Sequence, residues 1–262
     1  LINIKEGDKK WVIWKWVREH ESLLNSADII HVHDVFYWLY WYKLTHPLKK
    51  IFTTFHGWEG VYPIPLKNIV HKNLASMLSN GSIGVGDYIS KWYGIKPKLI
   101  TYGACDAPKV ASQIDSKNKT LLFLGRLDSD TGFEECVKKY HLLKHVLDWK
   151  LIVAGDGPLK SLIPPEATHL GFVSNPAHYI SQADYVFTTG YMGILESFVQ
   201  KKIVLSSYAN PVKKDYLLMH PMSKYLVFDN QIPSALPQEA YHWAVDQTWK
   251  KVSELYLKLW SK

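Results

Sequence analysis

The sequence is poor in cysteine, with only Cys105 and Cys136 among its 262 residues. Their spacing fits neither a zinc site nor a redox motif, which excludes a disulfide framework and indicates a reducing compartment. No apolar run is long enough to span a bilayer, since the richest, residues 35–42 (VFYWLYWY), is short and lies between Asp34 and Lys43. A signal peptide, internal repeats and low-complexity tracts are also lacking. We therefore expect a cytoplasmic protein.

Positive charge and tryptophan are concentrated in the first part of the chain. The net charge is +7, and residues 1–110 hold 14 Lys and Arg against 9 Asp and Glu, together with 7 of the 11 tryptophans. This combination is typical of a domain that binds an anionic membrane surface or nucleic acid. An ordinary basic surface around a tryptophan-containing core fits equally well. No nucleic-acid motif is present, so that class is disfavoured.

Apolar runs and helical patterns alternate along the whole chain, which predicts an α/β protein with a doubly wound parallel sheet in each half. Polar residues 103–118 lack periodicity and are expected to form a linker. The expected domains are therefore 1–110, 111–236 and a closing helical segment, 237–262. Strands are expected at 27–32, 50–55, 82–85, 99–102, 120–125, 150–154, 168–172, 184–188 and 202–206. Helices are expected at 11–25, 36–48, 66–79, 87–93, 132–147, 176–182, 192–200 and 237–260.

Two of the predicted strands end in glycine turns. Gly125-Arg126 follows TLLFL, and Gly155-Asp156-Gly157-Pro158 follows WKLIVA. A strand, a glycine turn and a helix in this order form phosphate and nucleotide sites at the carboxyl edge of parallel sheets. An arginine beside the first turn suits an anionic ligand. This segment therefore predicts both a fold class and a ligand class.

Seven short motifs occur in an order that resembles a retaining glycosyltransferase of the GT-B fold, family 4. They are ADIIHVHD, TTFHG, SIGVGDYISKWYG, LLFLGRL, LIVAGDGPL, HLGFV and ADYVFTTGYMGILES, and the resemblance covers roughly residues 27–215. It implies two Rossmann-like domains that face a cleft. The second domain would bind mainly the nucleotide-sugar donor and the first mainly the acceptor. The resemblance implies that the nucleotide-sugar is a substrate and that no cofactor or metal is needed.

The resemblance assigns most donor-binding roles to the second half. Arg126 would contact the donor diphosphate, where a guanidinium stabilises the charge of the leaving group, and Gly125 would allow close backbone approach. Glu196 would bind the ribose hydroxyls from the start of a helix, whose N–H groups hold phosphate. Phe172 and Val173 are implied to cradle the base with their backbone groups. The other implied donor-binding residues are Gly155, Asp156, Gly157, Gly193, Ile194 and Leu195.

Histidines mark the ends of two strands in the first half. His56 ends the strand in TFHG and would face the transferred sugar, according to the resemblance; a packed structural histidine is the alternative. His31 and His33 are two residues apart on one strand, so their side chains face the same way. Relatives carry a similar HxH without metal, so we expect no zinc there.

The chain departs from the family pattern at three places. Thr131 stands where a second diphosphate-binding lysine is usual, and it joins the donor-binding candidates at that position. Thr188 stands where the first of two glutamates is usual, and the usual glycine-rich first strand does not precede Leu1. We therefore expect a chain that is truncated, minimal or degenerate. Asp128-Ser129-Asp130 spells a DxD metal motif of another fold, but we interpret it as a turn that caps the following helix.

The expected function is transfer of a sugar from a UDP- or GDP-linked donor to an acceptor hydroxyl, with retention. The acceptor is expected to be a glycan, lipid or protein, and the basic, aromatic first domain favours a lipid-linked one at a membrane surface. A non-catalytic sugar-nucleotide-binding relative or partner subunit is the alternative that Thr131 and Thr188 favour.

Overall fold

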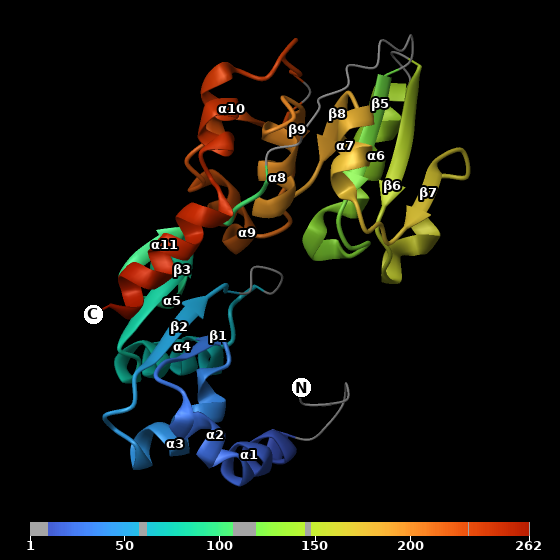
Figure 1. The fold of residues 1–262 in the computed structure, drawn as a ribbon. Coiled ribbons are helices and arrows are strands. Elements are labelled where there is room, and N and C mark those ends of the chain that lie inside the picture. Colours follow the sequence, from blue (N-terminus) through green and yellow to red (C-terminus); the bar gives the residue numbers. More distant parts are fainter. Residues whose placement is uncertain (1–9, 58–61, 107–118, 145–147, 230, 262) are drawn as a thin grey trace. The chain divides into compact units, whose positions relative to one another are not determined.

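The computed structural model describes residues 10–57, 62–106, 119–144, 148–229 and 231–261. Within this part the chain divides into two compact units (Figure 1). The first contains the described residues up to 101, apart from residue 62, together with those from 254 onward. The second contains residue 62 and residues 102–253. The chain enters the second unit at Tyr102, and most of the expected linker, residues 107–118, lies outside the described residues.

The first unit is built on a parallel sheet of four described strands in the order β1-β2-β3-β4. They are β1 (Ile30–His33), β2 (Ile51–Phe55), β3 (Gly81–Val85) and β4 (Leu99–Thr101). Each strand lies next to the one before it in the chain, on the same side each time. Right-handed connections therefore place the intervening helices on one face of the sheet. The last helix of the chain covers the other face, where Leu259 packs on Phe52 and Ile83. All four strands were predicted within a few residues.

The helices of the first unit are shorter than the sequence pattern indicated. They are α1 (Lys10–Glu19), α2 (Glu21–Ser26), the 3-10 turn η1 (Phe36–Leu39), α3 (Tyr40–Thr45), α4 (Leu66–Leu78) and α5 (Tyr88–Tyr93). The single helix expected over 11–25 is wrong, because the helix is interrupted at His20. The ring of His20 stacks on Trp16 and its Nδ1 lies 3.0 Å from the Trp16 carbonyl oxygen. This local bond competes with continuation of the helix.

The second unit holds a parallel sheet of six described strands in the order β10-β9-β8-β5-β6-β7. They are β5 (Lys119–Leu124), β6 (Trp149–Ala154), β7 (Thr168–Gly171), β8 (Tyr185–Phe187), β9 (Ile203–Leu205) and β10 (Leu226–Val227). The strand order reverses between β5 and β8. Ligands of open parallel sheets bind at the carboxyl ends of the strands at such a reversal. The topology therefore directs attention to the ends of β5 and β8.

Helices α6 (Phe133–Lys144), α7 (Pro176–Gln182), α8 (Tyr191–Phe198) and α9 (Pro211–Leu218) connect these strands, with 3-10 turns η2 (Ser129–Thr131), η3 (Pro158–Leu162) and η4 (Ser223–Tyr225). Helices α7 and α9 begin alike. The side chains of Asn175 and Asn210 accept hydrogen bonds from backbone N–H groups three residues later, and each is followed by proline. Both features favour a helix start. Helix α9 and strand β10 were not predicted.

The C-terminal region forms two helices, α10 (Gln238–Val245) and α11 (Trp249–Trp260). The single helix expected over 237–260 is therefore wrong. Thr248 lies in the break, and its Oγ1 accepts a hydrogen bond from the Lys251 N–H at 3.3 Å, so a new helix starts there. Helix α10 packs on α8, whereas α11 from Glu254 onward belongs to the first unit. No described helix has the length and apolar character needed to cross a bilayer.

Candidate functional site

The two predicted glycine turns interlock at the carboxyl ends of β5 and β6. The Gly125 N–H donates to the Ala154 carbonyl at 3.2 Å, and the Leu127 N–H donates to the Asp156 carbonyl at 2.9 Å. Gly155 has φ +154°, and a Cβ on it would lie 1.8 Å from the Gly125 carbonyl oxygen. The close contact between the two turns therefore depends on Gly155, whereas a Cβ on Gly125 would make only ordinary contacts with protein atoms.

A second tight contact follows at Gly157. A Cβ there would lie 2.5 Å from the Leu127 carbonyl oxygen. The Gly157 N–H also donates to the Asp156 carboxylate at 2.8 Å, which lowers the pKa of that exposed carboxyl. Gly155 and Gly157 thus keep the two turns of the sheet edge in backbone contact.

Arg126 extends from the first turn with its side chain 65% exposed. Its Nη2 donates to Asp130 Oδ2 at 2.7 Å, and its Nη1 lies 3.6 Å from Asp128 Oδ2. Both carboxylates come from the loop that follows Arg126. A phosphate ligand would have to compete with them for the guanidinium, although exposed ion pairs of this kind are weak.

Thr131 holds this loop together. Its Oγ1 donates to the Arg126 carbonyl at 2.6 Å and accepts from the Asp128 N–H at 3.3 Å, while the Asp128 carboxylate accepts from the Ser129 N–H. These bonds form a capping box around η2. Asp128 therefore caps the 3-10 turn η2, which precedes α6, rather than the helix itself, and the Thr131 hydroxyl binds the loop's own backbone.

Helix α8 follows β8 and begins at Tyr191, with Gly190 as its N-cap. Ile194 and Leu195 are fully buried, so their side chains belong to the core. A Cβ on Gly193 would lie 2.4 Å from Thr188 Oγ1, so the helix packs directly on the buried Thr188 side chain. Glu196 is the sixth residue of the helix, and the expectation that it lies at the helix start is wrong.

Burial shapes the acid–base properties of Glu196. Its side chain is partly buried, and desolvation raises its pKa. The neighbouring Cys105 thiol is affected in turn, because burial and then the charge of Glu196 raise its pKa to about 11. A carboxylate kept in this position at a cost in solvation is a candidate for contact with a ligand.

Replacing Glu196 with Gln is expected to stabilise the protein at neutral pH. Because the folded-state pKa of Glu196 is raised, the folded protein binds the proton more tightly than the unfolded chain does. The stability that Glu196 supplies is therefore present below its ordinary pKa of 4.5 and lost as pH rises through the folded-state pKa. Melting temperatures of both proteins should converge in acid and separate toward neutrality.

Glu166 offers a control with the opposite sign. The Lys144 ammonium donates to it at 2.6 Å, and this bond lowers the pKa of Glu166. Glu166→Gln should therefore be neutral or destabilising near neutral pH, with any difference fading in acid. A gain for Glu196→Gln that is independent of pH would contradict the desolvation argument.

The end of β7 presents an aromatic ring to solvent. Phe172 is 91% exposed and follows Gly171, which has φ +66°. Val173 instead packs against the core cluster of Leu122, Ala154 and Ile180. Of the two predicted base-binding residues, only Phe172 has a side chain free to stack on a planar ligand.

Sequence reasoning missed Ser207 and Thr189 at the same edge. Thr189 Oγ1 donates to the Thr131 carbonyl at 3.1 Å, which ties the end of β8 to the Arg126 loop. Ser207 Oγ is buried without a hydrogen-bond partner in the described structure, and a Cβ on Gly132 would lie 2.6 Å from it. An unpartnered buried hydroxyl is unusual. The only signal was the polar pair Ser206-Ser207 after an apolar run.

In the first unit, His56 lies at the end of β2 and contacts β1. Its Nε2 lies 2.9 Å from His33 Nδ1, and its backbone N–H donates to the Asp34 carboxylate at 3.2 Å. Asp34 also pairs with Lys72, a buried lysine whose ammonium lies 5.0 Å from the centre of the Tyr93 ring. Asp34 has φ +58°, so the turn after β1 is held in an uncommon conformation by these bonds.

His31 is held neutral by the C-terminal helix. The Trp260 indole N–H donates to its Nδ1 at 2.9 Å, so its proton is on Nε2 and is donated to Thr54 Oγ1, also at 2.9 Å. Burial, then the nearby His33, lowers the pKa of His31 to about 4. The two rings face the same way, as predicted, with centroids 5.3 Å apart. Among the described residues no group of three or more His, Cys, Asp or Glu side chains could hold a metal ion.

Neither a protein-family model nor a curated protein matches the chain. Solved structures match the chain over nearly its whole length. TarM superposes on 97% of the chain with a TM-score of 0.70 at 12% identity. The pneumococcal O-GlcNAc transferase GtfA, in complex with UDP and GlcNAc, covers 94% with a TM-score of 0.63 at 13% identity. AviGT4, a glycosyltransferase involved in avilamycin A biosynthesis, covers 93% with a TM-score of 0.56 at 15% identity.

The chain has the GT-B fold. Both Rossmann-like units of that fold are present, with the glycine turns and Arg126 at the carboxyl edge of the second sheet. The chain spans only part of these structures: 58% of TarM, 59% of GtfA and 77% of AviGT4.

Proposed function

We propose that this chain is the nucleotide-sugar-binding part of a glycosyltransferase. The observation that supports this most directly is the pair of interlocked glycine turns beside Arg126, the first of which follows β5, the strand next to the reversal of strand order between β5 and β8. In GtfA, a protein of the same fold, the solved complex contains UDP and GlcNAc. A UDP-linked donor is therefore our first choice, with a GDP-linked donor second.

In this proposal different residues of the second unit contact different parts of the donor. Arg126 neutralises the diphosphate, which gains charge as the glycosidic bond breaks. Glu196 accepts hydrogen bonds from the ribose hydroxyls, and the exposed Phe172 ring stacks on the base. In the first unit, His56 donates to a hydroxyl of the transferred sugar. The acceptor, a glycan, lipid or protein hydroxyl, attacks the anomeric carbon, and a diphosphate oxygen takes its proton.

Retention of configuration follows from the resemblance to family 4 and is part of the proposal. Independence of metal is a second part, supported by the engagement of Asp128 and Asp130 with backbone N–H groups and Arg126. The proposed place of action is the cytoplasm, at a membrane if the acceptor is lipid-linked.

A non-catalytic nucleotide-sugar binder is the second candidate. Three observations favour it: Arg126 is paired with two carboxylates, Thr131 caps its own loop, and the buried Thr188 replaces a carboxylate. Removal of one stabilising group at a developing charge typically costs a factor of about 10²–10³ in rate. A protein of this kind would bind the donor without turning it over.

A panel of UDP-, GDP- and ADP-sugars separates these functions. A ligand that binds only the folded protein raises its melting temperature, so we expect a shift with at least one sugar nucleotide. Phe172→Ala should reduce that shift without changing the melting temperature of the free protein, because the ring is exposed. Slow hydrolysis of the bound donor supports the transferase, and binding alone supports the second candidate. No shift with any donor would contradict both.

A further inference from the structure

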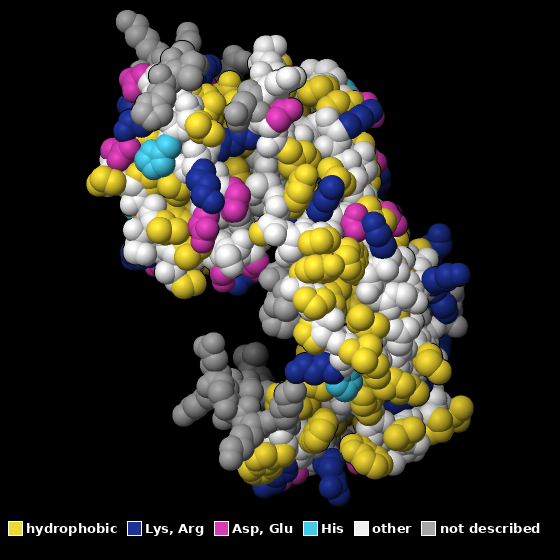
Figure 2. All heavy atoms as spheres, turned by 180° about the vertical axis from the view of Figure 1, so that it is seen from behind, with side chains coloured by type: hydrophobic (Ala, Val, Ile, Leu, Met, Phe, Trp, Pro, Cys, Tyr) yellow, Lys and Arg dark blue, Asp and Glu magenta, His cyan; other side chains and the backbone are white. Residues whose placement is uncertain are grey.

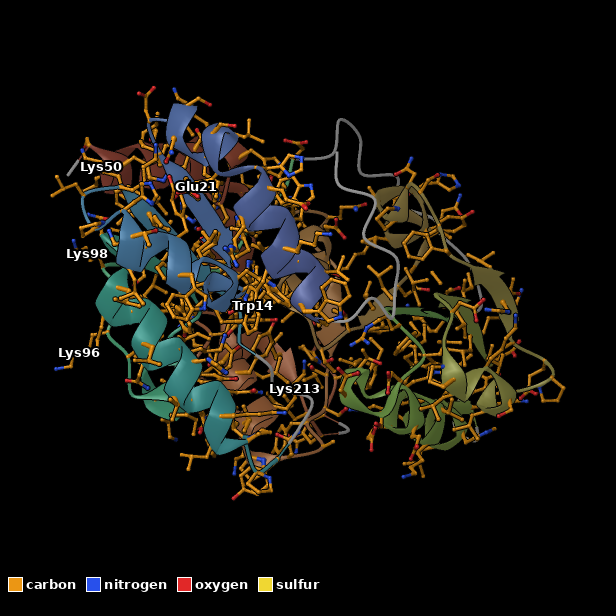
Figure 3. All side chains as sticks on the ribbon, turned by 90° about the horizontal axis from the view of Figure 1, so that it is seen from below. Trp14, Glu21, Lys50, Lys96, Lys98 and Lys213 are labelled. Carbon is orange, nitrogen blue, oxygen red and sulfur yellow. The ribbon has the colours of Figure 1, made fainter. Side chains whose placement is uncertain are left out.

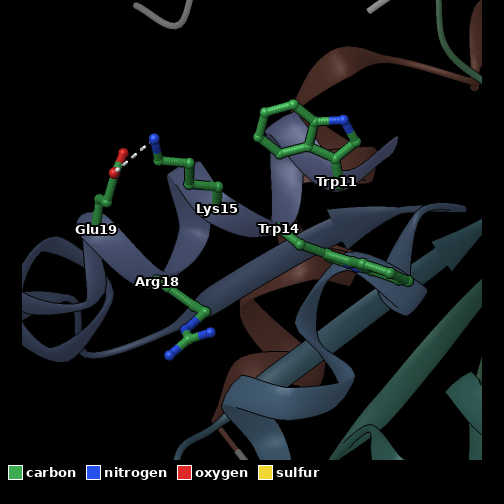
Figure 4. Close-up of a pocket in the computed structure, with 5 residues that line it drawn as sticks. All are labelled: Trp11, Trp14, Lys15, Arg18 and Glu19. Carbon is green, nitrogen blue, oxygen red and sulfur yellow. Dashed lines mark ion pairs between the residues drawn. The ribbon is translucent and has the colours of Figure 1, made fainter. Parts of the chain in front are cut away.

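Helix α1 has an outward face made of tryptophan and cations. Trp11, Trp14, Lys15 and Arg18 recur at helical spacing on α1 (Figure 4), and all four are exposed. Residues 12, 13, 16 and 17 between them are half-buried. Trp11 is 57% and Trp14 41% exposed. Tryptophan is on average highly buried in folded proteins. The apolar stripe that α1 uses for packing is thus a different one from this face.

Helix α3 continues the same surface. Trp14 packs edge-to-face on Trp38 of η1, with ring centroids 5.9 Å apart, and together with Arg18 and Trp41 these rings line a hollow of about 450 Å³. Trp41 is 69% exposed and Leu44, one turn later, is 63% exposed. We call the set Trp11, Trp14, Lys15, Arg18, Trp41 and Leu44 the tryptophan face. Hydrophobic side chains gather over the first unit with lysine and arginine beside them (Figure 2).

The charges on this face are available to an anionic partner. Arg18 has no carboxylate partner among the described residues, and it lines hollows on both sides of Trp14. Lys15 lies 3.6 Å from Glu19 in an exposed pair, which is worth little in water. The nearest acidic neighbour on α2, Glu21, is already 3.2 Å from His46. Two cations, Lys15 and Arg18, and two carboxylates, Glu19 and Glu21, line the two hollows, and Arg18 is the cation among them that has no ionic partner in the described part of the chain.

We propose that the tryptophan face docks the protein on an anionic lipid bilayer. Indole rings favour the boundary between headgroups and acyl chains, where one side of the ring is wet and the other apolar. Lys and Arg beside them add attraction to anionic headgroups, and the exposed Leu44 adds apolar area. Nucleic acid would use the rings and cations but gives no role to Leu44. This surface is separate from the donor site, so the two proposals can fail independently.

Sedimentation of the full chain with vesicles tests the proposal. Vesicles of phosphatidylcholine mixed with phosphatidylglycerol should bind the protein, and added salt or pure phosphatidylcholine should weaken binding. Trp11→Ser/Trp41→Ser should reduce the partition coefficient on the order of tenfold, since both exposed rings lose apolar area at the interface. Arg18→Gln should reduce it about fivefold, the equivalent of about 1 kcal/mol for one cation near an anionic surface.

Matched controls lie elsewhere in the chain. Trp249 of the second unit is 53% exposed, so Trp249→Ser removes a comparable ring. Lys96 is exposed in the first unit but lies far from Trp14 (Figure 3), so Lys96→Gln removes a distant cation. Neither should change the partition coefficient. Equal losses in a control and in its matched variant, or no binding to any vesicle, would overturn the proposal.

The outward stripe of α4 provides one more discriminating variant. Leu66, Val70 and Met77 are exposed at helical spacing, without a tryptophan or arginine among them. Val70→Ser/Met77→Ser should leave vesicle binding intact. If this variant abolishes binding while Trp11→Ser/Trp41→Ser does not, the tryptophan face is not the docking surface.

Discussion

Replacing Gly155 with alanine is expected to lower the free energy of unfolding of the second unit by about 4 kcal/mol, the sum of backbone strain and a forced displacement. The new Cβ would lie 1.8 Å from the Gly125 carbonyl oxygen, which is backbone and cannot rotate away. Gly155 also has φ +154°, where residues with a Cβ are strained. The turns after β5 and β6 would have to separate.

Alanine substitutions at two other glycines of the same unit separate the contribution of backbone strain from that of the steric clash. Gly171 has φ +66° but nothing within 4 Å of its would-be Cβ, so Gly171→Ala reports strain alone, about 1 kcal/mol. Gly190 has neither feature, so Gly190→Ala should cost only about 0.5 kcal/mol, for the loss of glycine at the N-cap of α8. Calorimetry can resolve the transition of the second unit. A loss for Gly155→Ala no larger than that for Gly171→Ala would mean that the turns are not in backbone contact.

The parts of the fold that follow from local chemistry were predictable. A β-branched or aromatic run that ends in glycine predicted β5 and β6, and their glycine turns meet because parallel strands end at one edge. The breaks at His20 and Thr248 were not predictable, since the apolar periodicity continues across both and only a side-chain bond to backbone reveals them. Short elements such as β10 carry too few residues to give a pattern.

The sequence predicted which residues lie near one another at the candidate site, but it did not predict most of the bonds that they make. Glycine spacing located the two turns that meet at the sheet edge, but the pairing of Arg126 with Asp130 depends on the path of a loop that Thr131 closes. Glu196 was placed at a helix start because the sequence does not show how far α8 extends before it. Ile194 and Leu195 carry a family motif, yet their side chains face the core, so any donor contact of theirs is made by backbone.

Arg126→Ala is expected to reduce donor turnover by a factor of about 10²–10³, the usual effect of removing one group that stabilises a developing negative charge. The side chain is exposed, so the variant should fold normally. Asp130→Asn should act in the opposite direction. It weakens the charge-assisted bond of 2.7 Å that holds the guanidinium, and a phosphate no longer competes with a carboxylate. The donor dissociation constant should therefore fall in Asp130→Asn and rise in Arg126→Ala.

The chain's other arginine supplies the control. Arg18 lies on α1 of the first unit, and Arg18→Ala removes the same charge without touching the donor cradle. Arg18→Ala should leave donor affinity and hydrolysis unchanged. The double variant Arg126→Ala/Asp130→Asn should have the same donor affinity as Arg126→Ala alone, because Asp130 acts on the donor only through Arg126. If Arg126→Ala binds the donor as tightly as the unmodified chain does, the proposed contact between Arg126 and the diphosphate is wrong. Tighter binding in Asp130→Asn with no hydrolysis in any variant would instead favour the non-catalytic binder, in which the loop carboxylates keep the guanidinium occupied.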